Sequence, residues 1–447
     1  MMTTAYYPTE SLLKPAVGFG IAALVGILVA TGQLPFVFFA IALLVALIVQ
    51  LFDNSLGMWF LGLASVHAVW SYLSVALPGA SSSSANNASL FALEAFKIYF
   101  AGISAMLVGF GLSTKPDLRW RPVTLKLKRF DWWTLVLAGI GCLLVGYVLS
   151  GIGFVQMILT GTFSRYFGEE QVGASYSLYQ SLLRRGLAIL IIVAPLLVLR
   201  WQQHKSTARF LAAGAGLFFM MSTVRRGPIF MALVSLVLSN AVAGKHRRLI
   251  AITLISFVVA FFVIQGLLVT VDTDADTALA STAFILRSAT SEVNDLAWVL
   301  SEWNHHWYMG ATWLAAVWPL PATISDFKNT YVLTSVTKDI VGISREFESG
   351  GLRISMFGEA YLNFGYAAVI GLGLLFGFLI RKFNGLVDWA RGQGPLILFP
   401  CMFLYLAGLY QFYLSGTGTL PDSILSFVMI AIIYGVSVQR NPQPAGN

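Results

Sequence analysis

Long apolar runs recur along most of the chain and restrict its fold more than any other feature. Runs of about 15–23 residues approach the length of helix that crosses a bilayer. With only 11% charged residues, a 447-residue chain could not cover the surface of a soluble protein. These observations predict an all-α polytopic integral membrane protein, with residues 1–447 as a single transmembrane domain. We expect about 12 transmembrane helices, near residues 16–32, 34–52, 57–77, 91–112, 132–150, 186–200, 208–222, 228–243, 249–271, 361–380, 394–413 and 423–437.

The basic residues predict the orientation of these spans. Four connections between expected spans carry clusters of Lys and Arg, at 115–129, 200–209, 245–248 and 381–391. Alternating spans place all four connections on the same side of the membrane, together with both termini. Because Lys and Arg are enriched in cytoplasmic loops, that side is expected to be the cytoplasm. The net charge of +8 then requires no nucleic-acid partner.

One long polar segment, 272–360, separates the ninth and tenth expected spans and holds more than half of the 20 acidic residues. The predicted orientation makes it an extracytoplasmic loop. Its residues 284–303 show helical spacing, with an apolar face and an opposite face that carries Arg287, Asp295 and Glu302. Residues 310–324 are apolar but interrupted by prolines, which favours a lid or re-entrant element over a span.

Several arginines lie on the side away from the cytoplasm. Arg184-Arg185-Gly186 and Arg225-Arg226-Gly227-Pro228 are expected to open the sixth and eighth spans, and Arg353 precedes the tenth. Backbone N–H groups at a helix start, together with guanidinium groups, suit a phosphate. We therefore interpret these arginines, with Arg287, as candidate pyrophosphate ligands. Anchoring of helix ends to lipid phosphates is the alternative.

Acidic and histidine residues near the end of the loop are candidates for a general base. Glu359 is the first choice, followed by Asp295, Glu292 and the pair His305-His306. Glu359 could instead complement the dipole of a helix start, and the histidines could be interfacial residues beside Trp303 and Trp307.

Two further patterns concern helix packing. Glu94 and Lys97 lie one turn apart near the outer end of the fourth run, and they are expected to pair or to snorkel to the interface, since a lone charge within a bilayer is costly. Glycines in the tenth span are expected to allow close approach of a neighbouring helix; they are Gly365, Gly371, Gly373 and Gly377.

Familiar cofactor motifs do not occur in a credible context. The sequence contains no Walker motif, dinucleotide fingerprint or metal-spaced Cys/His set, and Cys142 and Cys401 lie within apolar runs. We therefore expect no cofactor and no metal. A reaction on the extracytoplasmic face would need an activated donor that is already carried by the membrane.

Two stretches carry a resemblance to a known family. One is Ser355-Met356-Phe357-Gly358-Glu359-Ala360-Tyr361-Leu362-Asn363-Phe364-Gly365, which runs into a glycine-rich span. The other is Ser222-Thr223-Val224-Arg225-Arg226-Gly227-Pro228 at the entry to the eighth span. Together with the many spans and the late, long external loop, they resemble the bacterial oligosaccharide repeat-unit polymerases, the Wzy-type O-antigen polymerase group.

This resemblance implies a GT-C-like membrane glycosyltransferase of the bacterial inner membrane, acting in polysaccharide biosynthesis. Its donor and acceptor would both be glycans linked to polyprenyl (undecaprenyl) pyrophosphate, and a chain-length regulator is a possible partner beside the membrane lipids. The arginines would hold the leaving pyrophosphate, Glu359, Asp295, His305 or His306 would act on the acceptor hydroxyl, and Asn363 and Tyr361 would bind sugar. The alternatives are an O-antigen ligase-like transferase and a 12-span transporter or flippase. Charges concentrated in external loops, and halves that do not match each other, favour an enzyme over a transporter.

Overall fold

The computed structural model describes 61, 64, 67–68, 71, 88–114, 123–151, 176–223, 226–243, 292–318, 325–343 and 352–439. These residues are almost all helical, apart from a two-residue antiparallel bridge in which β1 (Thr124–Leu125) pairs with β2 (Val438–Gln439). The expected spans 16–32, 34–52 and 249–271, and most of 57–77, lie outside the described residues.

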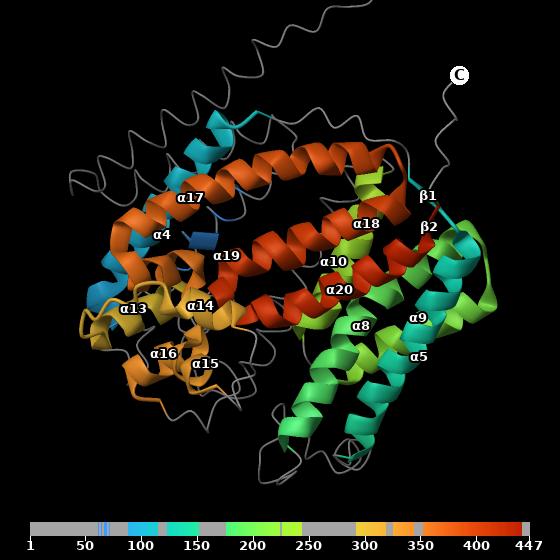
Figure 1. Ribbon diagram of the computed structural model, residues 1–447, viewed down its shortest axis with the longest axis horizontal. Helices are drawn as coiled ribbons and strands as arrows, with labels where there is room; N and C mark the ends of the chain where they lie inside the picture. The colour runs from blue at the N-terminus through green and yellow to red at the C-terminus, as the bar shows by residue number, and fades with distance from the viewer. Residues whose placement is uncertain are drawn as a thin grey trace, which may run out of the picture. The chain divides into compact units, whose positions relative to one another are not determined.

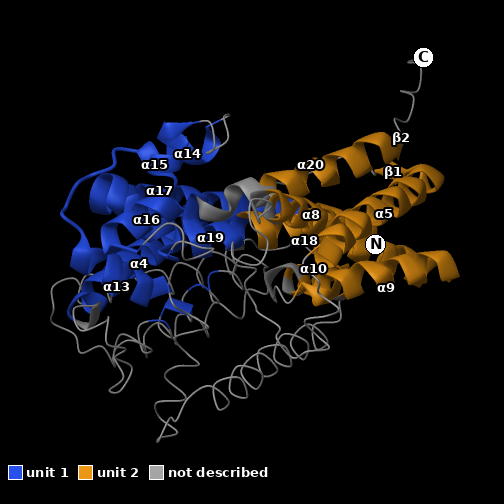
Figure 2. Ribbon diagram, turned by 90° about the horizontal axis from the view of Figure 1, so that it is seen from below, with its two compact units in different colours: residues 1–117, 257–386, 409–419 blue, residues 118–256, 387–408, 420–447 orange. Residues whose placement is uncertain are grey.

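The chain divides into two compact units, coloured separately in Figure 2. Unit 1 contains α4 (Ala88–Leu112), α13 (Glu292–Glu302), α14 (Ala311–Val317), α15 (Asp326–Tyr331), α16 (Leu333–Val341), most of α17 (Ser355–Arg391), α19 (Gln411–Ser415) and the 3₁₀ turn η3 (Gly416–Thr419). Unit 2 contains β1, β2, α5 (Leu127–Gly151), α8 (Tyr176–Gln203), α9 (Thr207–Ser222), α10 (Arg226–Ala243), α18 (Pro395–Phe403), most of the π-helix η2 (Leu404–Tyr410) and α20 (Leu420–Ser437).

Each expected span that falls within the described residues coincides with a helix. Five helical segments there are long and apolar enough to cross a membrane, namely Leu90–Leu112, Leu127–Gly151, Ser181–Gln203, Ser355–Arg391 and Pro395–Ser415. Shorter apolar helices cover Thr207–Ser222, Met231–Asn240 and Ile424–Ser437. The prediction of an all-α membrane protein is therefore confirmed at this level, while the count of twelve spans and the GT-C-like architecture stay predictions.

Unit 2 is built around three helices, α5, α8 and α9, that pack on one another (Figure 1). Small residues lie where the helices come closest: a Cβ on Gly186 of α8 would lie 2.8 Å from the Val145 side chain of α5. Leu190 and Gly141 form the same kind of close approach one turn along. This is the packing expected of membrane helices, in which small residues let backbones approach.

The same helix corrects the sequence prediction for Arg184 and Arg185. Helix α8 begins at Tyr176, about two turns before these arginines, so they do not open a helix and their backbone N–H groups are inside it. Both side chains are exposed. Gly186, which suggested a helix start, is needed instead for the contact with α5.

A buried ion network joins the ends of α5, α8 and α9. Arg200 is 2% exposed, and its Nε and Nη2 donate to the two oxygens of Asp131 at 2.7 and 2.9 Å. Arg209 Nη2 donates to Asp131 Oδ2 at 2.6 Å. Asp131 thus pairs with two cations, and its bidentate contact with Arg200 is the stronger kind of charge-assisted bond.

We expect Asp131→Asn to lower the free energy of unfolding by about 1.5–3 kcal/mol, because a neutral amide leaves the buried Arg200 charge without its counter-ion. Thermal unfolding of the purified protein in detergent would measure the loss. Asp388→Asn is the matched control: its side chain is 37% exposed and 3.8 Å from Arg391, so the change should stay within about 0.5 kcal/mol. Equal melting temperatures for the two variants would contradict the prediction.

In unit 1, α4 and α17 cross in close contact (Figure 1). A Cβ on Gly373 would lie 2.5 Å from the Gly102 carbonyl oxygen, and one on Gly377 would overlap the Met106 carbonyl oxygen. Close packing is therefore confirmed for these two glycines. It is wrong for Gly371, which has open space around it, and Gly365 has a different role: with φ of +65° it breaks α17 after Phe364.

The expected pairing of Glu94 with Lys97 on α4 is also confirmed, with Lys97 Nζ 3.5 Å from Glu94 Oε2. The other oxygen of Glu94 accepts a hydrogen bond from the Tyr366 hydroxyl of α17 at 2.7 Å. The carboxylate therefore links the two crossing helices as well as its own turn.

Candidate functional site

Residues with unusual backbone dihedral angles, and polar side chains that are completely buried, lie at and around the start of α17 in unit 1. Among the residues that the structure describes, three that are not glycine have positive φ: His305 at 60°, Met309 at 50° and Ser355 at 58°. Such conformations are uncommon for these residue types, and they persist where the surrounding structure imposes them, often at functional sites. All three lie in or beside the segments that contact the first turns of α17.

Glu359, in the second turn of α17, is completely buried and holds three segments together. Its Oε1 accepts hydrogen bonds from the Thr312 hydroxyl at 2.8 Å and the Thr417 hydroxyl at 2.5 Å. Its Oε2 accepts from the Thr417 backbone N–H at 2.7 Å. Gly416 has φ of +56°, and a Cβ there would overlap Oε2, so only glycine fits beside the carboxylate. These bonds stabilise the carboxylate in place and leave it no exposed surface.

Asn363, one turn after Glu359, is equally buried and extends the same network. Its amide nitrogen donates to the Thr312 hydroxyl at 2.7 Å and to the Glu359 carbonyl oxygen at 2.8 Å. Its side-chain oxygen accepts from the Gly310 N–H at 2.8 Å. The predicted shared face of Glu359 and Asn363 is thus present. The amide nitrogen and the side-chain oxygen of Asn363 both hydrogen-bond to protein groups, so its predicted role in binding sugar has no direct support from this geometry.

Tyr361 and the predicted histidines belong to an aromatic cluster at the surface of unit 1. The Tyr361 ring is half-buried, with ring centroids 5.9 Å from Trp303, 5.8 Å from Trp307 and 5.2 Å from Tyr366. His305 and His306 are exposed, and their rings pack against Trp303 and Tyr308. Both the predicted catalytic role of the histidines and their interfacial alternative therefore stay open, whereas Tyr361 lies among the aromatic rings that a sugar could stack on.

A second ionisable cluster, which we call the His67 cluster, consists of His67, Glu292, Asp295 and Arg353. Glu292, the first residue of α13, is 1% exposed, and its Oε2 lies 2.9 Å from His67 Nε2. Its Oε1 lies 3.7 Å from Arg353 Nη1, and the Arg353 guanidinium is half-exposed. Asp295 Oδ2 accepts the Arg353 backbone N–H at 2.9 Å. Asp295 thus helps to fix the chain just before α17, and Arg353 extends the cluster to the surface.

The charges within the His67 cluster keep Glu292 ionised. Burial raises the pKa of Glu292, but the nearby His67 and then Arg353 outweigh it, so the pKa is lowered overall. A carboxyl whose pKa is lower in the folded than in the unfolded state stabilises the fold at pH values above its unfolded pKa. That stability is lost as the pH falls through the folded value. At neutral pH the group is an anion that can only accept hydrogen bonds.

The remaining predicted arginines lie elsewhere or cannot be placed. Helix α10 begins at Arg226, so the predicted helix start at Arg225-Arg226 is confirmed, although Arg225 and the Arg226 side chain lie outside the described positions. Arg287 also lies outside them. Arg184, Arg185 and Arg226 belong to unit 2, whereas Arg353 and Glu359 belong to unit 1. Joint action of these arginines on one pyrophosphate stays a prediction.

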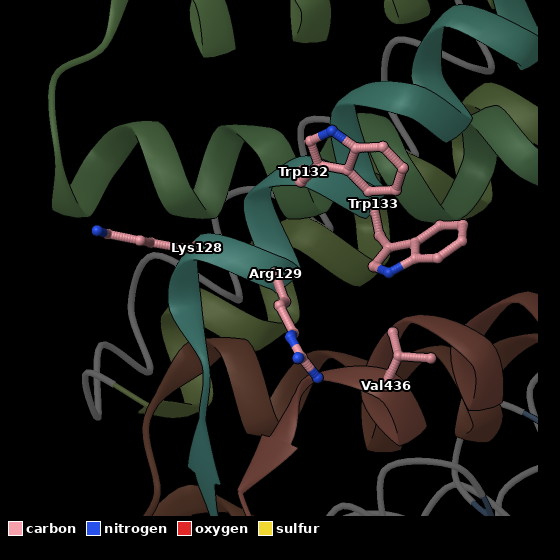
Figure 3. A pocket seen from close by; sticks show the side chains of 5 residues that line it. All are labelled: Lys128, Arg129, Trp132, Trp133 and Val436. Carbon is pink, nitrogen blue, oxygen red and sulfur yellow. The ribbon is translucent and has the colours of Figure 1, made fainter.

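A shallow open hollow in unit 2 contains none of the predicted site residues. It is lined by Lys128, Arg129, Trp132, Trp133 and Val436, and Figure 3 shows the two indole rings at its edge with Lys128 pointing away. The expected orientation places the start of α5 at the cytoplasmic surface. Basic residues next to tryptophans are typical of a helix end at the membrane interface, so we interpret the hollow as part of that anchoring.

Four residues of these clusters were absent from the sequence prediction: His67, Thr312, Gly416 and Thr417. The threonines and the glycine are remote from Glu359 in the sequence and carry no motif. His67 did carry a signal, because an ionisable residue near the middle of an apolar run is itself unusual.

The clusters and the helices together define the class of the protein: it is mainly helical and embedded in a membrane, with buried ionisable groups at the start of α17. Comparison with known proteins adds no finer assignment, since no protein family, curated protein or solved structure matches the chain.

Proposed function

We propose that the protein is a membrane glycosyltransferase that polymerises polyprenyl-pyrophosphate-linked oligosaccharide repeat units at the extracytoplasmic face. The observation that carries the proposal is the His67 cluster at the start of α17. It places a buried carboxylate, a histidine and a half-exposed arginine at the end of a helix long enough to span a membrane. Acid–base groups beside a cation are what transfer from a pyrophosphate carrier to a hydroxyl requires.

Each group has a role in the proposed reaction. The acceptor hydroxyl attacks the anomeric carbon of the growing glycan, the bond from that carbon to the phosphate oxygen breaks, and the lipid pyrophosphate leaves with the electron pair. Arg353 would stabilise the developing charge on the pyrophosphate. The aromatic rings around Tyr361 would provide apolar surface for the sugar.

A transporter or flippase of lipid-linked oligosaccharide is the second candidate, and one contact favours it. His67 lies at the centre of the expected span 57–77, and its contact with Glu292 joins that span to the polar loop. Ionisable pairs at such depth also occur in proton-coupled transporters. A ligase-like transferase would use the same groups as the polymerase with a different acceptor.

Deletion of the gene separates these functions. We expect the surface glycan on a gel to collapse to single repeat units, because export continues while polymerisation stops. Plasmid-borne wild-type protein should restore the ladder. Loss of all exported glycan would support the flippase, long polymer left unattached with no repeat unit on the acceptor would support the ligase, and an unchanged ladder would overturn the proposal.

A further inference from the structure

His67 has one ring nitrogen that no group within the described part of the chain satisfies. The side chain is 10% exposed, and while Nε2 faces Glu292 at 2.9 Å, Nδ1 is buried without a hydrogen-bond partner. Leaving a buried polar atom unpaired destabilises the folded protein. Such an atom in a native structure therefore calls for a reason, and one reason is a ligand that supplies the missing bond.

The group that contacts Nε2 determines which of the two ring nitrogens of neutral His67 carries the proton. Because the ionised Glu292 carboxylate can only accept, the proton between the two side chains belongs to His67 Nε2. The neutral form of the ring then carries a lone pair on Nδ1. This is the arrangement in which a carboxylate fixes a histidine in one tautomer and leaves its other nitrogen as a base.

The other candidate bases are less well arranged. The Glu359 carboxylate already accepts three hydrogen bonds from Thr312 and Thr417, and Gly416 lies directly against its Oε2. His305 and His306 are exposed, and their rings pack against aromatic side chains. Only His67 combines burial, an orienting carboxylate and an unsatisfied nitrogen among the described residues.

We propose that His67 is the catalytic base that accepts the proton of a sugar hydroxyl through Nδ1, with Glu292 as its positioning residue. The inference rests on the proposed glycosyltransferase function and names the proton acceptor of that reaction. The hydroxyl O–H bond breaks as the N–H bond forms on Nδ1. The oxygen bonds to the anomeric carbon, and the lipid pyrophosphate leaves. The ring then returns its proton to solvent for the next cycle.

Three side chains surround the imidazole and affect its proton exchange. Glu292 on α13 faces Nε2, and Arg353 lies on the far side of that carboxylate. The Tyr413 ring of α19 meets the imidazole edge-on at 6.0 Å, and its hydroxyl donates to the Ala64 carbonyl oxygen at 3.0 Å. Among the described residues, Glu292 is thus the anion that contacts the ring.

The test uses full-length protein in lipid nanodiscs, with the lipid-linked repeat unit from the producing cell as substrate and the initial polymerisation rate measured against pH. We expect His67→Gln to lose about 100-fold or more in rate, the typical contribution of a general base. Glu292→Gln should lose less, because the amide keeps the shape of the side chain and an oxygen that can accept from His67 Nε2. His204→Ala, at an exposed histidine in unit 2, should match the wild type.

Nitrogen-15 NMR of the wild-type imidazole checks the arrangement without a substitution. At pH 8 we expect an unprotonated Nδ1 and a protonated Nε2; the opposite tautomer would overturn the inference. A folded His67→Gln protein with the wild-type rate and pH profile would overturn it while leaving the proposed function intact. No polymer from the wild-type protein itself would overturn both.

Discussion

Glu359→Ala is expected to destabilise unit 1 by about 3–5 kcal/mol, the largest effect of any single change near the candidate site. The substitution removes a completely buried side chain and the acceptor for two hydroxyls and one backbone N–H. Each buried donor that loses its acceptor costs about 1–3 kcal/mol, and the lost volume adds a cavity. The Thr417 N–H has the least freedom to find another partner, since it belongs to the backbone. Thermal unfolding in detergent would measure the change.

Two further variants separate a structural role of Glu359 from a catalytic one. Glu302→Ala removes an exposed carboxylate from α13 in the same unit and should change stability by no more than about 0.5 kcal/mol. Glu359→Gln keeps the shape of the side chain and one acceptor oxygen, so it should lose less stability than the alanine variant. If folded Glu359→Gln lost activity 100-fold, the carboxylate would act in the chemistry. Wild-type stability of Glu359→Ala would show that the hydrogen bonds described here do not hold the fold.

The helices could be predicted because long apolar runs have few alternatives to a transmembrane helix. Their ends were harder. Arg184-Arg185-Gly186 has the composition of a helix start, but α8 begins at Tyr176. The glycine proves to be a packing residue, because Val145 of α5 lies against it. A single sequence shows where a glycine lies. It does not show whether the glycine is required by a positive φ, by a closely packed neighbouring helix or by a turn.

The candidate site was predicted only in part, and for a related reason. Glu359 and Asn363 share a face because they are four residues apart on one helix, which is a local property. Thr312 and Thr417 reach Glu359 of α17, and His67 reaches Glu292 of α13, from distant parts of the chain, so these contacts depend on the tertiary fold. The sequence could point to the unusual residue His67 but not to Glu292 as its partner.

Gly377→Ala is expected to destabilise unit 1 by about 3 kcal/mol, at the upper end of the usual cost of overpacking. The added Cβ would overlap the Met106 carbonyl oxygen of α4 and lie 2.7 Å from the Phe110 nitrogen. Both are backbone atoms within a helix, so no side-chain rotation can relieve the overlap, and the two helices must move apart. Since the Glu359 network is built on the first turns of α17 and Arg353 of the His67 cluster immediately precedes that helix, we also expect activity to fall.

Gly371→Ala provides the matched control, because it makes the same chemical change on the same helix. Nothing lies within 4 Å of the position that its Cβ would take. Alanine also favours a helix over glycine by about 1 kcal/mol, so this variant should be as stable as the wild type or slightly more stable. Melting temperatures of the two variants in one detergent would give the comparison. Equal values would mean that α4 and α17 do not approach each other closely at Gly377.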